Sequence, residues 1–149
     1  MKISGTPPLP CLCANIRRVS RAITQRYEEA LRPVGLTITQ FTILQAVSLL
    51  GDITQGRLGE ILAMDSTTLT RTLAIMSREG WTEKRRGRDG RERSVALTKA
   101  GEKQLARGLP AWQKVQAKLQ RQLGNERWSS LLELTHQLTG EVAAHGELS

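Results

Sequence analysis

The stretch KRRGRDGRERSVALT, from Lys84 to Thr98, gathers the side chains of this chain that are best suited to binding an anion. Its first ten residues hold six Arg or Lys and two acids, a net charge of +4. Two strands joined by a turn at Arg88-Asp89-Gly90 would project this charge from the domain as a hairpin. We expect this hairpin to neutralise phosphates of DNA. The residues expected in that role are Lys84, Arg85, Arg86, Arg88 and Arg93.

Arg91 lies just past the turn and is the side chain expected to enter the minor groove, where negative potential attracts guanidinium groups. Asp89, two residues away, can accept a charge-assisted hydrogen bond from Arg91. That bond would orient the guanidinium before DNA arrives, which explains an acid at the centre of a basic hairpin. The alternative is a solvated hairpin with an exposed ion pair worth roughly 0–1 kcal/mol, and it applies to Lys84 and Arg93 more than to Arg91.

Residues 66–79 have the period of an amphipathic helix, with Leu69, Leu73 and Met76 on one narrow stripe. The opposite face is slim and polar enough to enter a major groove, where Arg71 can form two hydrogen bonds with one guanine. Backbone amides at the start of the helix are expected to face a phosphate. An ordinary surface helix has the same pattern, but the short helix before it and the hairpin after it favour DNA. The helix residues predicted to contact DNA are Ser66, Thr67, Thr68, Thr70, Arg71 and Arg78.

Capping residues and helix breakers divide the chain into elements. Thr39, Thr54 and Ser66 are the expected N-caps of three successive helices, and Pro110 is expected to bend or interrupt a later one. The order predicts a mainly α fold with a small two- or three-stranded β-wing, a winged helix-turn-helix. Helices are expected at 11–31, 39–50, 54–63, 66–79, 98–124 and 125–144, and strands at 81–86 and 93–98.

The remaining length is predicted to serve assembly. Residues 1–10 contain Pro and Gly and are expected to form an arm, and residues 36–97 the winged DNA-binding region. Residues 11–35 and 98–149 would be long helices with apolar stripes, which a single winged domain does not need. We therefore expect them to pair with a second subunit.

Composition limits the class of partner. The 149 residues carry a formal charge of +8, with a pI near 10.3, which favours nucleic acid first and an acidic membrane surface second. The charge is uneven, because residues 125–149 hold four Glu against one Arg. The start of the chain lacks the apolar run of a signal peptide, and the uncharged stretch 33–51 contains too many Thr, Gln and Ser to favour a membrane span. The expected location is the cytoplasm, with no membrane partner.

The chain resembles the MarR family (multiple antibiotic resistance regulators) of bacterial transcription factors. The motif D-x-R-x-x-x-V-x-L-T-x-x-G is present as DGRERSVALTKAG from Asp89 to Gly101, and GLTITQFTIL and MDSTTLTRTL support it. The resemblance implies a homodimer with interlocking terminal helices that binds a pseudo-palindromic operator in double-stranded DNA. It also implies control by a small phenolic or other anionic ligand, or by thiol oxidation, usually as a repressor.

The organic-hydroperoxide-sensing branch of that family implies a possible redox sensor. Cys13, and Tyr27 fourteen residues later, match the spacing of its reactive cysteine and tyrosine. On one helix this separation is roughly 21 Å, so the two side chains meet only if first helices of two subunits pair. Cys11 would point to the other side and could not join Cys13 while both were helical. Ile38 stands where that branch has a second tyrosine, and the alternative is that Cys13 is a small buried apolar residue.

Other sites are weaker in the sequence. The resemblance implies a ligand pocket between the dimerisation helices and the winged region, where Arg17, Tyr27, Phe41 and Trp112 are candidates. We find no catalytic motif and expect no enzyme, cofactor or metal site, since the histidines lie far from the C-x-C pair. The rival hypothesis is a winged-helix protein-interaction module that does not bind DNA.

Overall fold

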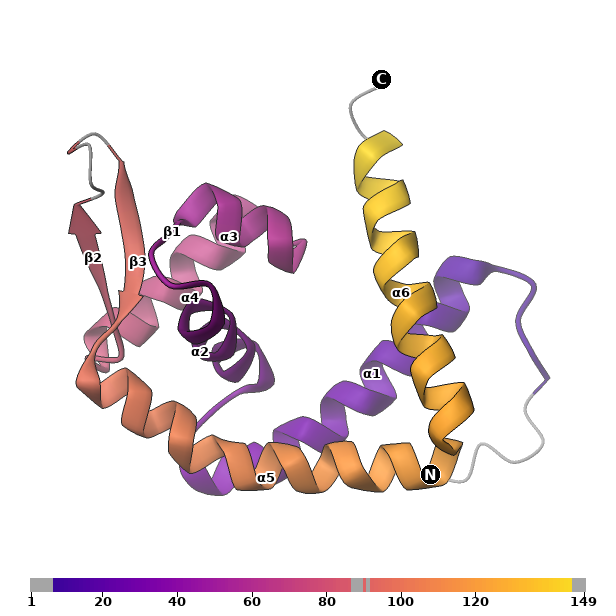
Figure 1. Ribbon diagram of the computed structural model, residues 1–149. Helices are drawn as coiled ribbons and strands as arrows, with labels where there is room; N and C mark the ends of the chain where they lie inside the picture. The colour runs from indigo at the N-terminus through magenta and orange to yellow at the C-terminus, as the bar shows by residue number, and fades with distance from the viewer. Residues whose placement is uncertain (1–6, 87–89, 91, 146–149) are drawn as a thin grey trace.

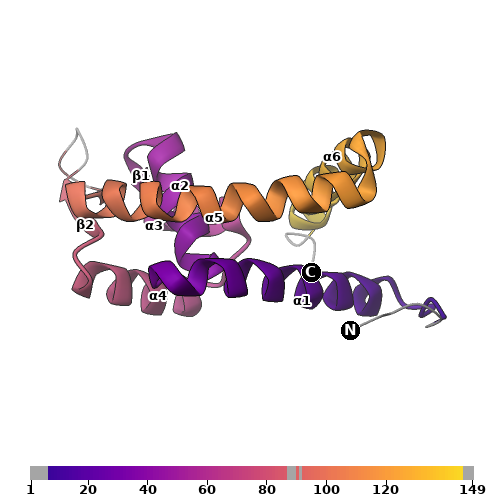
Figure 2. The same ribbon diagram turned by 90° about the horizontal axis from the view of Figure 1, so that it is seen from below.

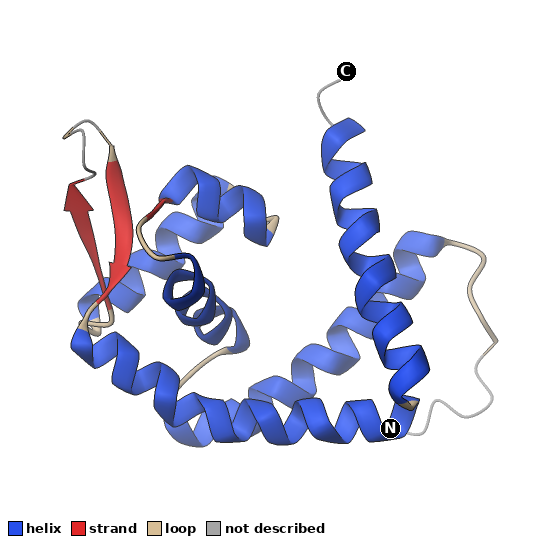
Figure 3. Cartoon of the chain, in the orientation of Figure 1, coloured by secondary structure: helices blue, strands red, loops and turns tan. Residues whose placement is uncertain are grey.

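The computed structural model describes residues 7–86, 90 and 92–145, with side chains as far as Val142. Helices dominate, and a small sheet lies at one end of the chain's long axis, as Figure 3 shows. The predicted fold class, mainly α with a β-wing, is confirmed. The elements are α1 (Leu12–Leu31), the 3-10 helix η1 (Arg32–Val34), α2 (Ile38–Leu50), β1 (Ile53–Thr54), α3 (Gln55–Leu62), α4 (Ser66–Arg78), β2 (Thr82–Arg86), β3 (Arg93–Leu97), α5 (Lys99–Leu123) and α6 (Asn125–His145).

The sheet has three antiparallel strands in the order β1-β3-β2. β2 and β3 form the hairpin, with Thr82 opposite Leu97 and Arg86 opposite Arg93. The short β1 joins the other edge of β3, where Ile53 pairs with Val95. This third strand ties the hairpin to the start of α3, so the wing is held at a fixed place beside the helices (Figure 1).

We call residues 36–97 the winged unit and the helices α1, α5 and α6 the stem. The core of the winged unit is closed, with Phe41 and Leu44 of α2, Leu58 of α3 and Met76 of α4 all completely buried. In the stem, α1 and α5 run alongside each other (Figure 2). Burial of the large apolar side chains therefore concentrates where α2, α3, α4 and the sheet meet.

Two helix starts differ from the prediction. The N-cap of α2 is Thr37 and not Thr39, because the Thr37 hydroxyl accepts from the Gln40 amide while the Gln40 side chain accepts from the Thr37 amide. The N-cap of α4 is Asp65 and not Ser66. α3 ends at a left-handed Ala63 (φ 50°), which brings Asp65 to the position before the new helix. The predicted Thr54 cap is confirmed by its bond to the Arg57 amide.

Pro110 was predicted to bend or interrupt its helix, and the interruption is wrong, because α5 continues unbroken from Lys99 to Leu123. The bend stays a prediction. Proline removes one helical hydrogen bond, but both flanks are held. On one side, a methyl group added at Gly108 would lie only 2.9 Å from the Phe41 ring, so α5 packs closely on α2. On the other side, the Tyr27 hydroxyl donates to Gln116 across the α1–α5 contact.

The junction between wing and stem is a close backbone contact. The Thr98 amide donates to the Trp81 carbonyl at 3.1 Å, and the Thr98 hydroxyl donates to the Gly80 carbonyl. The same hydroxyl accepts from the Gly101 amide and so caps α5. A methyl group at Gly101 would lie 2.0 Å from the Trp81 carbonyl oxygen. Glycine is therefore required here by space, which accounts for the last position of the D-x-R motif.

Among the described residues, no single helix is long and apolar enough to cross a membrane. Leu12–Val34 and Ile38–Leu50 pass that test only as a pair bent by 81°. The second helix of this pair, α2, supplies the centre of the core described above.

Candidate nucleic-acid interface

The two faces of α4 are as the sequence predicts. Leu69, Leu73 and Met76 are buried against the winged unit. The opposite face is exposed and carries hydroxyls, methyl groups and two cations, a surface that suits base edges and phosphates. Its exposed residues are Thr67, Thr70, Arg71, Ala74 and Arg78.

The first turn of α4 is arranged differently from the prediction. The Asp65 carboxylate accepts from the Thr68 amide at 2.9 Å and from the Thr68 hydroxyl at 2.6 Å. Both hydrogen bonds lower the pKa of Asp65 below its usual value, and the bond from the Thr68 hydroxyl has the larger effect. The Thr68 amide and hydroxyl are thus already hydrogen-bonded within the subunit. Fewer N–H donors than we expected are therefore left to bind a phosphate at this end of α4. Ser66 and Thr67 remain exposed at this end of the helix.

The outer strand of the wing is basic and exposed. Lys84, Arg85 and Arg86 follow one another along β2, and Arg93 faces Arg86 across the hairpin. Arg85 forms an ion pair with Glu83 at 2.7 Å, in which both side chains are about half exposed. Such a pair is worth roughly 0–1 kcal/mol, so it can orient Arg85 and still yield it to a phosphate.

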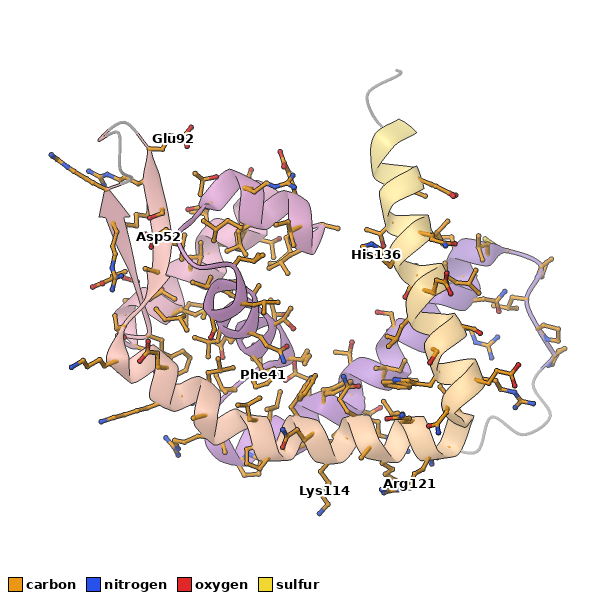
Figure 4. All side chains as sticks on the ribbon, in the orientation of Figure 1. Phe41, Asp52, Glu92, Lys114, Arg121 and His136 are labelled. Carbon is orange, nitrogen blue, oxygen red and sulfur yellow. The ribbon has the colours of Figure 1, made fainter. Side chains whose placement is uncertain are left out.

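The tip of the hairpin carries the remaining predicted contacts. Arg88, Asp89 and Arg91 lie outside the described residues, so the proposed Asp89–Arg91 pair stays a prediction. Glu92, at the hairpin end of β3, is described and exposed (Figure 4).

A hollow of about 540 Å³ lies between α4 and the wing. Two predicted DNA contacts line it, Thr70 from α4 and Lys84 from β2. Gln55, Ser77 and Glu83 also line it and were missed by sequence reasoning. Gln55 and Glu83 are polar residues beside a helix cap and within a basic strand, and no local pattern distinguishes them from ordinary surface positions.

The cysteines are placed for solvent access. Cys11 and Cys13 are free thiols and both are exposed. Cys13 therefore does not fill a core within its own subunit, and its burial in an assembled dimer stays a prediction. Cys11 is the N-cap of α1 with an extended backbone (φ −91°, ψ 119°), so the condition that both residues be helical is not met.

Tyr27 is directed into its own subunit. It is buried, its hydroxyl donates to the Gln116 Oε1 at 2.6 Å, and burial raises its pKa. Within one subunit the phenol holds α1 against α5 and does not face Cys13.

None of the four ligand-pocket candidates lines one of the main hollows found among the described residues, so their role in ligand binding stays a prediction. Phe41 is buried and stacks on Trp112 with ring centroids 5.8 Å apart, while Arg17 is exposed on α1. Besides the hollow between α4 and the wing, one of about 920 Å³ lies between the α3–α4 turn and α6, and one of about 470 Å³ lies between α1 and α5. Within the described part of the chain, no group of three or more His, Cys, Asp or Glu is placed to hold a metal ion.

Comparison with known proteins identifies the family of the chain. The model of the MarR family matches residues 36–92. The chain is 35% identical over 92 residues to an uncharacterised HTH-type transcriptional regulator, YwoH, of Bacillus subtilis, covering 62% of this chain and 67% of the relative. The crystal structure of the M. tuberculosis transcriptional regulator MosR in complex with DNA is 35% identical, with a TM-score of 0.79, covering 90% of this chain and 97% of MosR. The chain belongs to the MarR family.

A further relative is named for resistance to organic hydroperoxides. The organic hydroperoxide resistance transcriptional regulator of Bacillus subtilis is 33% identical over 91 residues, which cover 60% of this chain and 62% of that protein. These relatives are named as transcriptional regulators and not as enzymes. The protein is accordingly a MarR-family transcriptional regulator with a winged helix.

Proposed function

We propose that this MarR-family protein is a homodimeric, sequence-specific repressor that binds a pseudo-palindromic operator and is released by thiol oxidation or by a small anionic ligand. The observation that carries the proposal is the exposed, hydroxyl-rich and cationic face of α4 beside the basic strand β2. The DNA complex of MosR, a relative with the same fold, supports it.

The two basic elements serve different grooves. α4 enters the major groove, where Arg71 binds a guanine. The wing reaches the neighbouring minor groove, where Arg91 is the predicted inserted side chain. Arg78 together with Lys84, Arg85, Arg86, Arg88 and Arg93 neutralises phosphates, so binding weakens steeply as salt rises.

The stem provides the second subunit's contacts. In the single chain, Leu12, Ile16 and Val19 of α1 are exposed, as are Leu134 and Val142 of α6. Apolar side chains of this size gain roughly 1.5–3 kcal/mol each when they are buried. Pairing of α1 and α6 with a second copy covers them and presents two α4 helices to successive half-sites.

The thiols supply one means of release. An organic hydroperoxide transfers an oxygen atom to a cysteine thiolate, giving a sulfenic acid and the corresponding alcohol. A second thiol then forms a disulfide with loss of water. Cys13 is the proposed sensor and Cys11 the second thiol, since both are exposed to oxidant. The protein acts in the cytoplasm, on the nucleoid when bound.

The test is fluorescence anisotropy on duplex DNA from upstream of the protein's own gene. The titration is done with reduced protein, then after stoichiometric organic hydroperoxide, then after reductant. Loss of binding on oxidation with recovery on reduction supports thiol control, and Cys11→Ser and Cys13→Ser assign the thiol. Tight binding that is indifferent to peroxide points to a small anionic ligand. An intact dimer without affinity for any duplex supports the protein-interaction module instead.

A further inference from the structure

A hydrogen bond joins α3 to the exposed face of α4. The Gln55 Nε2 donates to the Thr70 Oγ1 at 2.8 Å. Gln55 is the first residue of α3, directly after the Thr54 cap, and Thr70 lies on the second turn of α4. The bond joins residues fifteen positions apart across the helix-turn-helix.

This bond decides what the Thr70 hydroxyl can do. A hydroxyl has one proton and two acceptor lone pairs, and Gln55 uses one of the lone pairs. Several helical threonines donate their proton to the carbonyl four residues earlier, as Thr72 does to Thr68 at 2.9 Å and Thr42 does to Ile38 at 2.8 Å. Thr68 donates its proton to the Asp65 carboxylate. Thr70 makes no such bond, and no acceptor for its proton is found among the described residues. Its hydroxyl is therefore oriented as a donor.

The position of Thr70 indicates what accepts that proton. Thr70 lines the hollow of about 540 Å³ between α4 and the wing, which Lys84 and Glu83 of β2 also line. When a helix occupies the major groove and a wing the next minor groove, the sugar–phosphate strand that separates the grooves lies between them. Thr70 thus faces the backbone strand and not the groove floor, and Lys84 faces the same strand from the wing.

We propose that Gln55 is a positioning residue of the DNA interface, which holds the Thr70 hydroxyl as a donor to a phosphate oxygen of the strand seated between α4 and the wing. This inference rests on the proposed DNA-binding function. It assigns Gln55 no contact with DNA and makes its effect depend entirely on Thr70.

The experiment measures anisotropy for the full chain with two duplexes, one from upstream of its gene and one of scrambled sequence, over a range of salt. The variants are Gln55→Leu, Thr70→Val and the double variant, with Thr72→Val as the matched control because its hydroxyl bonds within its own helix. Gln55→Asn, whose shorter side chain cannot reach Thr70, provides a second test if Gln55→Leu unfolds. Thermal unfolding confirms that each variant is folded.

We expect Gln55→Leu and Thr70→Val each to weaken binding to both duplexes by about three- to tenfold per half-site. The slope of log affinity against log salt concentration should not change, because a neutral hydroxyl releases no counterion. The double variant should be no weaker than either single one, and Thr72→Val should match the wild type.

Three results would overturn the inference. Additive losses in the double variant would show that Gln55 acts apart from Thr70. A loss confined to the upstream duplex would place Thr70 on a base edge, and unchanged affinity would remove Gln55 from the interface. In each case the wild type still binds DNA; failure of the wild type to bind either duplex would instead refute the proposed function.

Discussion

The winged unit and α6 differ in how far their large apolar side chains are buried. In the winged unit, Phe41, Leu58 and Met76 are completely buried. In α6, Leu134 is 62% exposed and Val142 is 65% exposed, and the helix stands apart from the winged unit (Figure 1). The winged unit closes a core of its own, even though Leu49 on its surface is exposed. Among the described side chains of α6, none is buried. This difference is the basis for the proposed pairing of α6 with a second copy of the chain.

The largest expected effect comes from comparing Gly101, at the junction where α5 contacts the winged unit, with Gly140 of α6. Gly101→Ala should destabilise the protein by about 3 kcal/mol or more, because the new methyl group would overlap the Trp81 carbonyl. Gly140→Ala in α6, where a methyl group meets nothing within 4 Å, should stabilise the helix by about 0.5–1 kcal/mol. Urea unfolding followed by circular dichroism measures both. A loss at Gly140 would show that α6 packs closely there in the assembly.

The assembly role of α6 can be tested with charge. Leu134→Glu combined with Val142→Glu should raise the dissociation constant of the dimer at least about tenfold, since burying the new carboxylates is unfavourable. Sedimentation velocity over a range of concentrations measures it. The control is Leu49→Glu, at a side chain of the winged unit that is 85% exposed and should leave assembly unchanged. Equal dissociation by both changes would contradict the division between the two regions.

Removing a cation from α4 of the winged unit should affect DNA binding, whereas removing one from α6 should not. Arg71→Ala should cost about 1–3 kcal/mol of binding to the operator and relax the preference at one base per half-site. Arg127→Ala, which removes an exposed cation of α6, should change neither. Anisotropy on duplexes with single base changes measures the preference. If Arg71→Ala weakened binding to operator and scrambled DNA equally, Arg71 would be a phosphate contact.

The smallest effect concerns the cap of α4. Because Thr68 donates to the Asp65 carboxylate, the pKa of Asp65 is lower in the folded state than in the unfolded chain. Asp65 therefore contributes stability above about pH 4, which is lost as the pH falls through the depressed folded pKa. The difference in unfolding free energy between the wild type and Asp65→Asn should shrink in acid. Urea titrations at several pH values test this, and a difference independent of pH would contradict it.

Local pattern and tertiary geometry explain which features the sequence could predict. The stripe of Leu69, Leu73 and Met76 was predictable because a helix repeats every 3.6 residues. The N-cap of α4 was predicted one residue late, because its position depends on where the preceding helix α3 ends, at Ala63. The roles of Gln55 and of Phe41 were hidden for a different reason. Their partners, Thr70 and Trp112, are brought close only by packing.

The junction at Thr98 and Gly101 has a mechanical consequence. It joins the first turn of α5 to the wing and to the end of α4, while the other end of α5 lies in the stem. A helix of 25 residues is a rod of about 37 Å. A tilt of about 5° imposed at one end moves the other by about 3 Å, close to the roughly 3.4 Å rise of one base step. In the proposed complex, the register of α4 on a duplex is therefore sensitive to small rotations of α5.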